Sequence, residues 1–161
     1  MRAKRLYFPL MIEFDIPLAD ETATARLGAA IAAPLCAGDV VALSGPLGAG
    51  KTTLARAIIA ALTGRKEAPS PTFTLAETYE TDDFTLWHFD LYRLEKAEEV
   101  WELGFEEALE GVSLIEWPER IERMLPAETL LIRLSMDGPA RRALVRGAGR
   151  WADRLSGFNP A

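Results

Sequence analysis

The chain has 161 residues, of which 49% are hydrophobic and 26% are charged, and its formal net charge is −6. This length fits one domain spanning residues 1–161, and this composition is typical of a globular protein and excludes a disordered or fibrous one. The acidic balance argues against a direct nucleic-acid binder, because binding to phosphates relies on Lys and Arg, and no apolar stretch reaches the ~20 residues of a membrane span.

The first half of the chain predicts a helix, a strand, a glycine-rich loop and a second helix. Residues 1–12 are interpreted as an edge strand or a leader extension. Asp20 is a suitable N-cap for a helix over about residues 21–33. The short apolar run 40–44 predicts a strand in the middle of a sheet, and residues 52–62 carry apolar side chains at helical spacing.

The second half of the chain predicts strands joined by turns and short helices. Residues 73–79 and 84–89 predict a hairpin, and a turn at 137–139 predicts another. The remaining predicted elements are short helices at 97–103 and 105–109, a buried strand at 112–115, a helix opened by Pro118, and hairpin strands at 129–135 and 140–145. The whole order predicts an α/β fold, with a mixed β-sheet flanked by helices.

One segment carries a phosphate-binding motif. Residues 45–52, GPLGAGKT, match the pattern G-x-x-x-x-G-K-[ST] between a predicted strand and a predicted helix. Glycines allow successive backbone N–H groups to turn towards one anion, Lys51 would reach the terminal phosphates, and the Thr52 hydroxyl would ligate magnesium. The expected nucleotide-binding residues of this loop are Leu47, Gly48, Ala49, Gly50, Lys51, Thr52 and Thr53. The sequence therefore predicts a P-loop NTPase-like domain.

Two carboxylates follow apolar runs that end near this loop if the strands are parallel. Glu116 follows residues 112–115, where a Walker B residue sits, and Asp90 follows residues 86–89. Ligands collect outside the carboxyl ends of strands in open α/β sheets, so Lys51, Asp90 and Glu116 would converge. The alternatives are a helix N-cap for Asp90 and a solvated strand end for Glu116.

Three further positions allow more than one interpretation. Thr72, in the segment SPTFT, presents a hydroxyl to the terminal phosphate and its metal, or belongs to a turn that enters a strand. Trp117 adjoins Glu116 and either borders the pocket or a partner, or packs in the interior. His88 is the only histidine, and we interpret it as a packed residue without a catalytic role.

Four segments together carry a family resemblance. GPLGAGKTTLARA, SPTFTL, HFDLYRL and LIEWPER occur in this order, and the chain resembles the TsaE family, the ATPase subunit of bacterial tRNA threonylcarbamoyladenosine synthesis, over about residues 15–146. The resemblance implies ATP and Mg²⁺ as ligands, with Glu116 as the metal carboxylate and Thr52 and Asp90 as further metal ligands. The residues that it places in the active centre are Lys51, Thr52, Thr72, Asp90, Glu116 and Trp117. It also implies nucleotide-base contacts near Glu21 and Arg141.

The same resemblance implies partner proteins. They would be similar to TsaB and TsaD, and TsaD would transfer the threonylcarbamoyl group to adenosine. This chain would contact tRNA only indirectly, through these partners. Its ATP hydrolysis would reset the complex. The single cysteine, Cys36, cannot form an internal disulfide, so we expect a reducing compartment and a cytoplasmic location.

Other functions remain to be weighed against this one. A P-loop small-molecule kinase would need a lid segment, and none is apparent in the sequence. A nucleotide-gated binding module would bind without turnover. A GTPase-like switch is disfavoured, because the sequence contains no Gln and its only Asn is Asn159.

Overall fold

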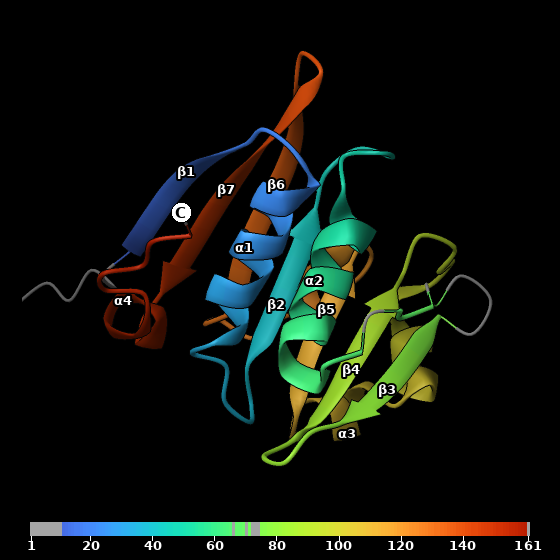
Figure 1. Ribbon diagram of the computed structural model, residues 1–161. Helices are drawn as coiled ribbons and strands as arrows, with labels where there is room; N and C mark the ends of the chain where they lie inside the picture. The colour runs from blue at the N-terminus through green and yellow to red at the C-terminus, as the bar shows by residue number, and fades with distance from the viewer. Residues whose placement is uncertain (1–10, 66, 70, 72–74, 161) are drawn as a thin grey trace, which may run out of the picture.

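Four parallel strands form the centre of a single sheet, and antiparallel strands complete both edges (Figure 1). In the computed structural model, which describes residues 11–65, 67–69, 71 and 75–160, seven strands lie in the order β1-β7-β6-β2-β5-β4-β3. The strands are β1 (Met11–Leu18), β2 (Val40–Ser44), β3 (Ala76–Glu80), β4 (Thr85–Asp90), β5 (Val112–Glu116), β6 (Leu130–Asp137) and β7 (Ala140–Ala148). The predicted mixed sheet is confirmed.

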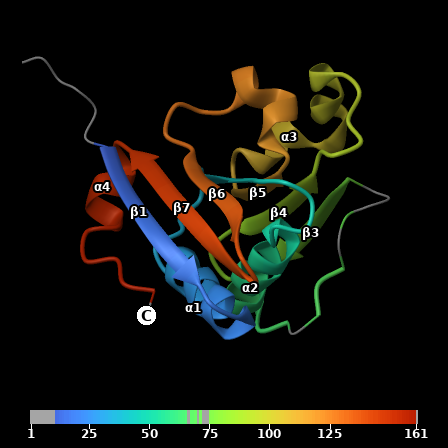
Figure 2. The same ribbon diagram turned by 90° about the horizontal axis from the view of Figure 1, so that it is seen from above.

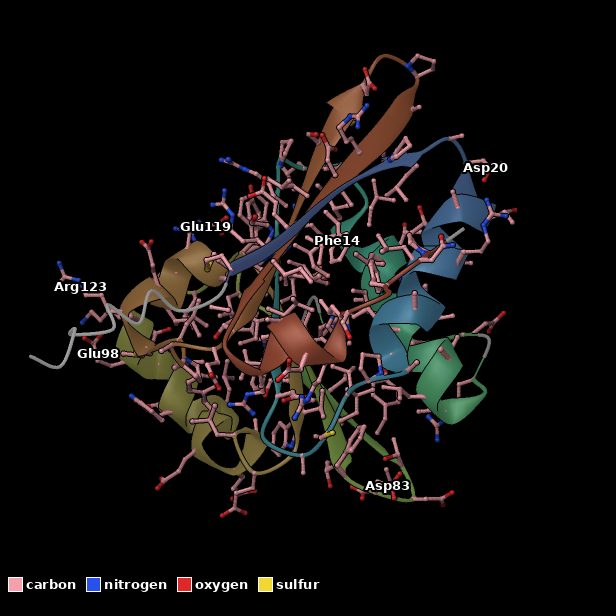
Figure 3. The ribbon with its side chains drawn as sticks, turned by 90° about the vertical axis from the view of Figure 1, so that its left-hand side faces the viewer. Phe14, Asp20, Asp83, Glu98, Glu119 and Arg123 are labelled. Carbon is pink, nitrogen blue, oxygen red and sulfur yellow. The ribbon has the colours of Figure 1, made fainter. Side chains whose placement is uncertain are left out.

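Helices cover both faces of this sheet (Figure 2). They are α1 (Glu21–Ala32), α2 (Lys51–Thr63), α3 (Phe105–Ala108), α4 (Arg150–Arg154), and the 3-10 helices η1 (Ala97–Leu103) and η2 (Pro118–Met124). The helices α1 and α2 lie side by side on one face, and η1, α3 and η2 lie on the other. Figure 3 shows Asp20, at the start of α1, on one side of the sheet, and Glu98, Glu119 and Arg123 on the other.

Local sequence explains the elements that precede the glycine-rich loop. The Asp20 carboxylate accepts a hydrogen bond from the Ala23 N–H at 2.8 Å, which caps α1 as predicted. A Cβ on Gly28 would lie 2.5 Å from that of Ala57, so glycine allows α1 to pack closely on α2. The side chains of Val40 to Leu43 are at most 2% exposed, because β2 is covered on both faces. The loop between β2 and α2 directly follows the last residue of β2, so it lies at the carboxyl end of the parallel strands.

The strand β1 overlaps the predicted edge strand only at residues 11 and 12, and the helix α4 was not predicted; both depend on tertiary contacts. The strand β1 extends to Leu18 although it contains Pro17, which has no backbone N–H. An edge strand tolerates proline because one of its two sides forms no hydrogen bonds with another strand. Of the predicted edge strand or leader at 1–12, residues 1–10 lie outside the described residues. The five-residue helix α4 is held by Trp151, whose indole N–H donates to the Glu128 carbonyl at 2.7 Å. Neither β1 nor α4 is marked by a strong local pattern in the sequence.

The predicted first hairpin is observed over a shorter span. The strands β3 and β4 pair antiparallel, from Ala76 opposite Phe89 to Glu80 opposite Thr85. Residues 73 and 74, where the predicted strand began, lie outside the described part of the chain. Across that part, the structure contains no helix long and apolar enough to span a bilayer.

Candidate functional site

The loop between β2 and α2 follows a path that glycine permits. Gly45, Gly48 and Gly50 have φ angles of 139°, 78° and 103°, in the region that other residues rarely adopt. A Cβ on Gly45 would clash with the carbonyl oxygen of Leu134. No side chain caps the first turn of α2, so its free N–H groups provide a ready site for an anion.

The carboxyl ends of the parallel strands meet beside this loop. Asp90 and Glu116 are directly paired neighbours at the ends of β4 and β5, and Glu116 also pairs with Leu43 of β2. A cavity of about 490 Å³ lies at this edge. Of the predicted site residues, those that line it are Leu47, Gly48, Gly50, Lys51, Thr52, Thr53, Asp90, Glu116, Trp117 and Arg141. The expected convergence of Lys51, Asp90 and Glu116 is therefore observed.

Glu116 is held through both of its carboxylate oxygens. It is only 2% exposed, so the alternative of a solvated strand end is wrong. Its Oε1 accepts a hydrogen bond from the Thr52 hydroxyl at 2.7 Å, and its Oε2 lies 2.7 Å from Nε2 of His88. His88 is fully buried, as its interpretation as a packed residue requires, but its contact with Glu116 was not foreseen.

Lys51 is packed against its own loop. Its Nζ donates to the carbonyls of Gly45 at 2.6 Å and Pro46 at 2.9 Å, and lies 4.2 Å from the centroid of the Trp117 ring. Burial lowers the pKa of Lys51, and the nearby carboxylates, that of Glu116 foremost, oppose this shift. The ammonium group is therefore held by the first two residues of the loop, beside the cavity that Lys51 lines.

Trp117 borders the cavity, in agreement with one of its two interpretations. Its φ of 59° is unusual for a bulky residue, and such a conformation costs on the order of 1–3 kcal/mol. The ring lies 4.9 Å from that of Tyr92, centroid to centroid. The two aromatic rings therefore form one wall of the cavity, above Lys51.

Asp90 is a buried acid at the end of β4. Its Oδ1 accepts a hydrogen bond from the Tyr92 N–H at 3.1 Å, but residues 91–95 contain no helix, so the alternative of a helix N-cap is wrong. Burial raises the pKa of Asp90, the Glu116 carboxylate adds to this, and the Tyr92 N–H and the charge of Lys51 oppose it. An ionised Asp90 therefore costs the metal-free protein stability.

The Asp90→Asn variant tests whether the ionised Asp90 carboxylate destabilises the metal-free protein. Because the pKa of Asp90 is raised when the protein folds, the free energy of unfolding falls as pH rises from the ordinary value of 3.8 through the raised value. In EDTA, Asp90→Asn should melt at a higher temperature than wild type at about pH 7, and the difference should shrink towards about pH 4. Circular dichroism melts measure both. The exposed Asp82→Asn is the matched control, and a lower melting temperature for Asp90→Asn at neutral pH would contradict the assignment.

The remaining predicted residues lie in different places. Arg141 of β7 donates from Nε at 3.2 Å and Nη2 at 2.9 Å to the Gly48 carbonyl. Glu21 is the first residue of α1 and is exposed outside the cavity lining, and Ala49 is buried within the loop. Thr72 lies outside the described residues, so its role stays a prediction.

Three residues of the cavity wall were not predicted: Leu75, Tyr92 and Arg93. Tyr92 and Arg93 belong to the segment HFDLYRL, which was a signal that could have identified them. Leu75 is likewise the last residue of the segment SPTFTL; it has a φ of 61°, and its carbonyl accepts a hydrogen bond from the Asp90 N–H at 3.0 Å.

The donor set of the cavity fits one magnesium ion bound together with phosphates. Thr52 offers a hydroxyl and Glu116 and Asp90 offer carboxylates, which are the oxygen ligands that Mg²⁺ prefers. Among the described residues, no group of three or more His, Cys, Asp or Glu side chains could hold a metal ion. Mg²⁺ bound to one or two protein side chains and to substrate phosphates needs no such group.

Comparisons with known proteins agree with these features. A profile of the family described as "Threonylcarbamoyl adenosine biosynthesis protein TsaE" matches residues 18–144. The tRNA threonylcarbamoyladenosine biosynthesis protein TsaE of Rickettsia felis is 46% identical over 121 residues, which are 74% of this chain and 71% of that protein. The protein of the same name from Bacillus subtilis is 40% identical over 124 residues, 76% of this chain and 75% of that one. The crystal structure of Bacillus subtilis YdiB superposes with a TM-score of 0.74 at 28% identity, covering 92% of this chain and 95% of that one.

Proposed function

Because this chain belongs to the TsaE family, which takes part in the biosynthesis of threonylcarbamoyladenosine in tRNA, we propose that it binds ATP with Mg²⁺ in the cavity and hydrolyses it. The observation that carries the proposal is the 2.7 Å hydrogen bond from Thr52 to Glu116. It joins the hydroxyl that follows the loop lysine to the acid that ends a neighbouring parallel strand, as in phosphate-binding loops that use magnesium.

In this proposal each part of the cavity has a separate task. The N–H groups of the loop and the Lys51 ammonium bind the phosphates, which compete with the carbonyls of Gly45 and Pro46 for that ammonium. Thr52 and Glu116 hold the metal, and bound Mg²⁺ neutralises charge on the phosphate oxygens. Asp90 orients the attacking water through the oxygen that the Tyr92 N–H leaves free.

We also place the chain in a complex, where it acts with partners similar to TsaB and TsaD in the cytoplasm. Its net charge of −6 supports a role in which the partners contact the tRNA. Hydrolysis in the cavity would then reset the complex between rounds of modification. The role in a complex is preferred to the kinase alternative because no lid segment is apparent in the sequence.

The experiment that tests the function measures phosphate release from labelled ATP. We expect slow hydrolysis by the chain alone that requires Mg²⁺, with several-fold acceleration by TsaB-like and TsaD-like partners. Rates that the partners leave unchanged would contradict the proposal, and label transferred to a small metabolite would favour a kinase. Partner affinity measured with ATP and with ADP separates hydrolysis from simple gating, because equal affinities exclude a gated binding module.

A further inference from the structure

His88 lies on β4, two residues before Asp90, and is not one of the residues that line the cavity. It is fully buried on β4, directly opposite Leu114 of β5. Side chains two residues apart on a strand share a face, so Leu86, His88 and Asp90 lie on one face of β4, and Leu86 belongs to the same core cluster as the buried apolar residues of α2. Leu86, like Leu114, is a fully buried leucine. His88 therefore occupies a position that its neighbours fill with apolar side chains.

The hydrogen bonds of His88 show what the imidazole adds at this position. Its Nε2 lies 2.7 Å from Oε2 of Glu116, and both side chains are withdrawn from solvent. Its Nδ1 is buried and has no hydrogen-bond partner within the described structure. A buried nitrogen without a partner is unfavourable, so packing alone does not account for histidine here. The bond to Glu116 is the contact that a leucine could not supply.

This bond determines which carboxylate oxygen faces the cavity. Glu116 is paired with Asp90, and His88 lies two residues before Asp90 on β4, so the Glu116 side chain turns back along the sheet for its Oε2 to meet His88. The other oxygen, Oε1, then faces the Thr52 hydroxyl. We propose that His88 is a positioning residue, which donates its Nε2–H to Oε2 and thereby presents Oε1 of Glu116 to the metal beside Thr52. This inference rests on the proposed function, because it takes Mg²⁺ to bind at these two residues.

Three substitutions separate hydrogen bonding from packing. The amide nitrogen of glutamine reaches about as far along the side chain as Nε2 of histidine, so His88→Gln keeps a donor for Oε2. Asparagine is one methylene shorter, so His88→Asn keeps the amide but not its reach. His88→Leu keeps the bulk and removes the donor. Leu86→Val, which removes one methylene from the same buried face, controls for loss of stability.

The experiment measures metal dependence and hydrolysis with the full-length protein. Calorimetry gives the affinity for ADP in EDTA, and manganese titrations followed by electron paramagnetic resonance give the metal affinity of the protein–ADP complex. Loss of a group that orients a metal ligand typically weakens metal binding about 10- to 100-fold. We expect at least about a tenfold loss for His88→Leu and His88→Asn, with ADP affinity in EDTA unchanged. His88→Gln should stay within about threefold of wild type, and the order of kcat values should follow the order of metal affinities.

The results of these measurements distinguish a failure of the His88 inference from a failure of the proposed function. Equal metal affinities for His88→Asn and His88→Gln, both folded, would overturn the inference, as would a Leu86→Val defect as large as that of His88→Asn. If His88→Leu does not fold, the two amide variants decide alone. Failure of wild type to bind ADP with Mn²⁺ would instead refute the proposed function itself. Wild-type metal binding that none of the His88 variants alters would refute only the role of His88.

Discussion

The Lys51→Met variant is expected to lose at least about 100-fold in affinity for Mg-ATP while keeping its fold. Hydrogen bonds to charged groups contribute about 1.5–3 kcal/mol each, and about 1.4 kcal/mol corresponds to tenfold in affinity, so the loss of two such bonds to phosphate reaches that size. Methionine has nearly the length of lysine and fills the same buried space beneath Trp117. Burial lowers the pKa of Lys51, so removing the charge also removes a desolvation cost.

Thermal melts with and without Mg-ATP measure this result. A ligand that binds only the folded state raises the melting temperature according to its concentration and affinity. Wild type should therefore melt higher with Mg-ATP, and Lys51→Met should melt at the same temperature with or without it. Lys96→Met, which alters an exposed lysine of the same chain, serves as the control and should respond as wild type does. A full response from Lys51→Met would contradict the role of the loop in phosphate binding.

Glu116→Gln should lower the rate of ATP hydrolysis by about 100-fold or more, or about 2.7 kcal/mol in the activation barrier. An amide is a poor ligand for Mg²⁺ and removes one negative charge from the metal site. The fold should tolerate the change, because the amide oxygen still accepts the Thr52 hydrogen bond. His88 adapts by carrying its proton on Nδ1, which leaves Nε2 free to accept from the amide N–H.

Single-turnover phosphate release, with the enzyme in excess over ATP, isolates the chemical step from product release. The matched control is Glu122→Gln, which changes an exposed glutamate on η2 and should hydrolyse ATP as wild type does. ATP affinity in EDTA should be the same for all three proteins. Hydrolysis by Glu116→Gln within a few-fold of wild type would mean that Glu116 does not hold the metal.

Sequence reasoning worked best where structure is encoded locally. The strand, loop and helix around Lys51 follow from a buried apolar run, three glycines and helical spacing, all within 25 residues or so. The convergence of Asp90 and Glu116 needed only one further assumption, that their strands run parallel to β2, and the register bears it out. Which carboxylates lie beside Lys51 was therefore indicated before their positions were known.

Features that depend on distant contacts could not be predicted in this way. The partner of His88 is 28 residues away in sequence, and a lone histidine between aromatic residues gives no sign of which carboxylate it meets. The strand β1 pairs with β7, whose residues follow more than 120 positions later, and its exposed acids meet arginines there, as Glu13 meets Arg146. The bond from Arg141 to Gly48 likewise spans 93 residues.

The buried Asp39 shows how far the folding unit extends. This carboxylate, 1% exposed at the start of β2, is paired with Arg150 at 3.1 Å and also with Arg154, both of which belong to α4. The family profile ends at residue 144, before either arginine. The strand that leads into the glycine-rich loop thus depends for its charge balance on residues beyond those that the family profile matches. A shortened protein cut at residue 144 would lose both arginines and leave the Asp39 carboxylate without its ion-pair partners, so a stable shortened form has to retain residues up to Arg154.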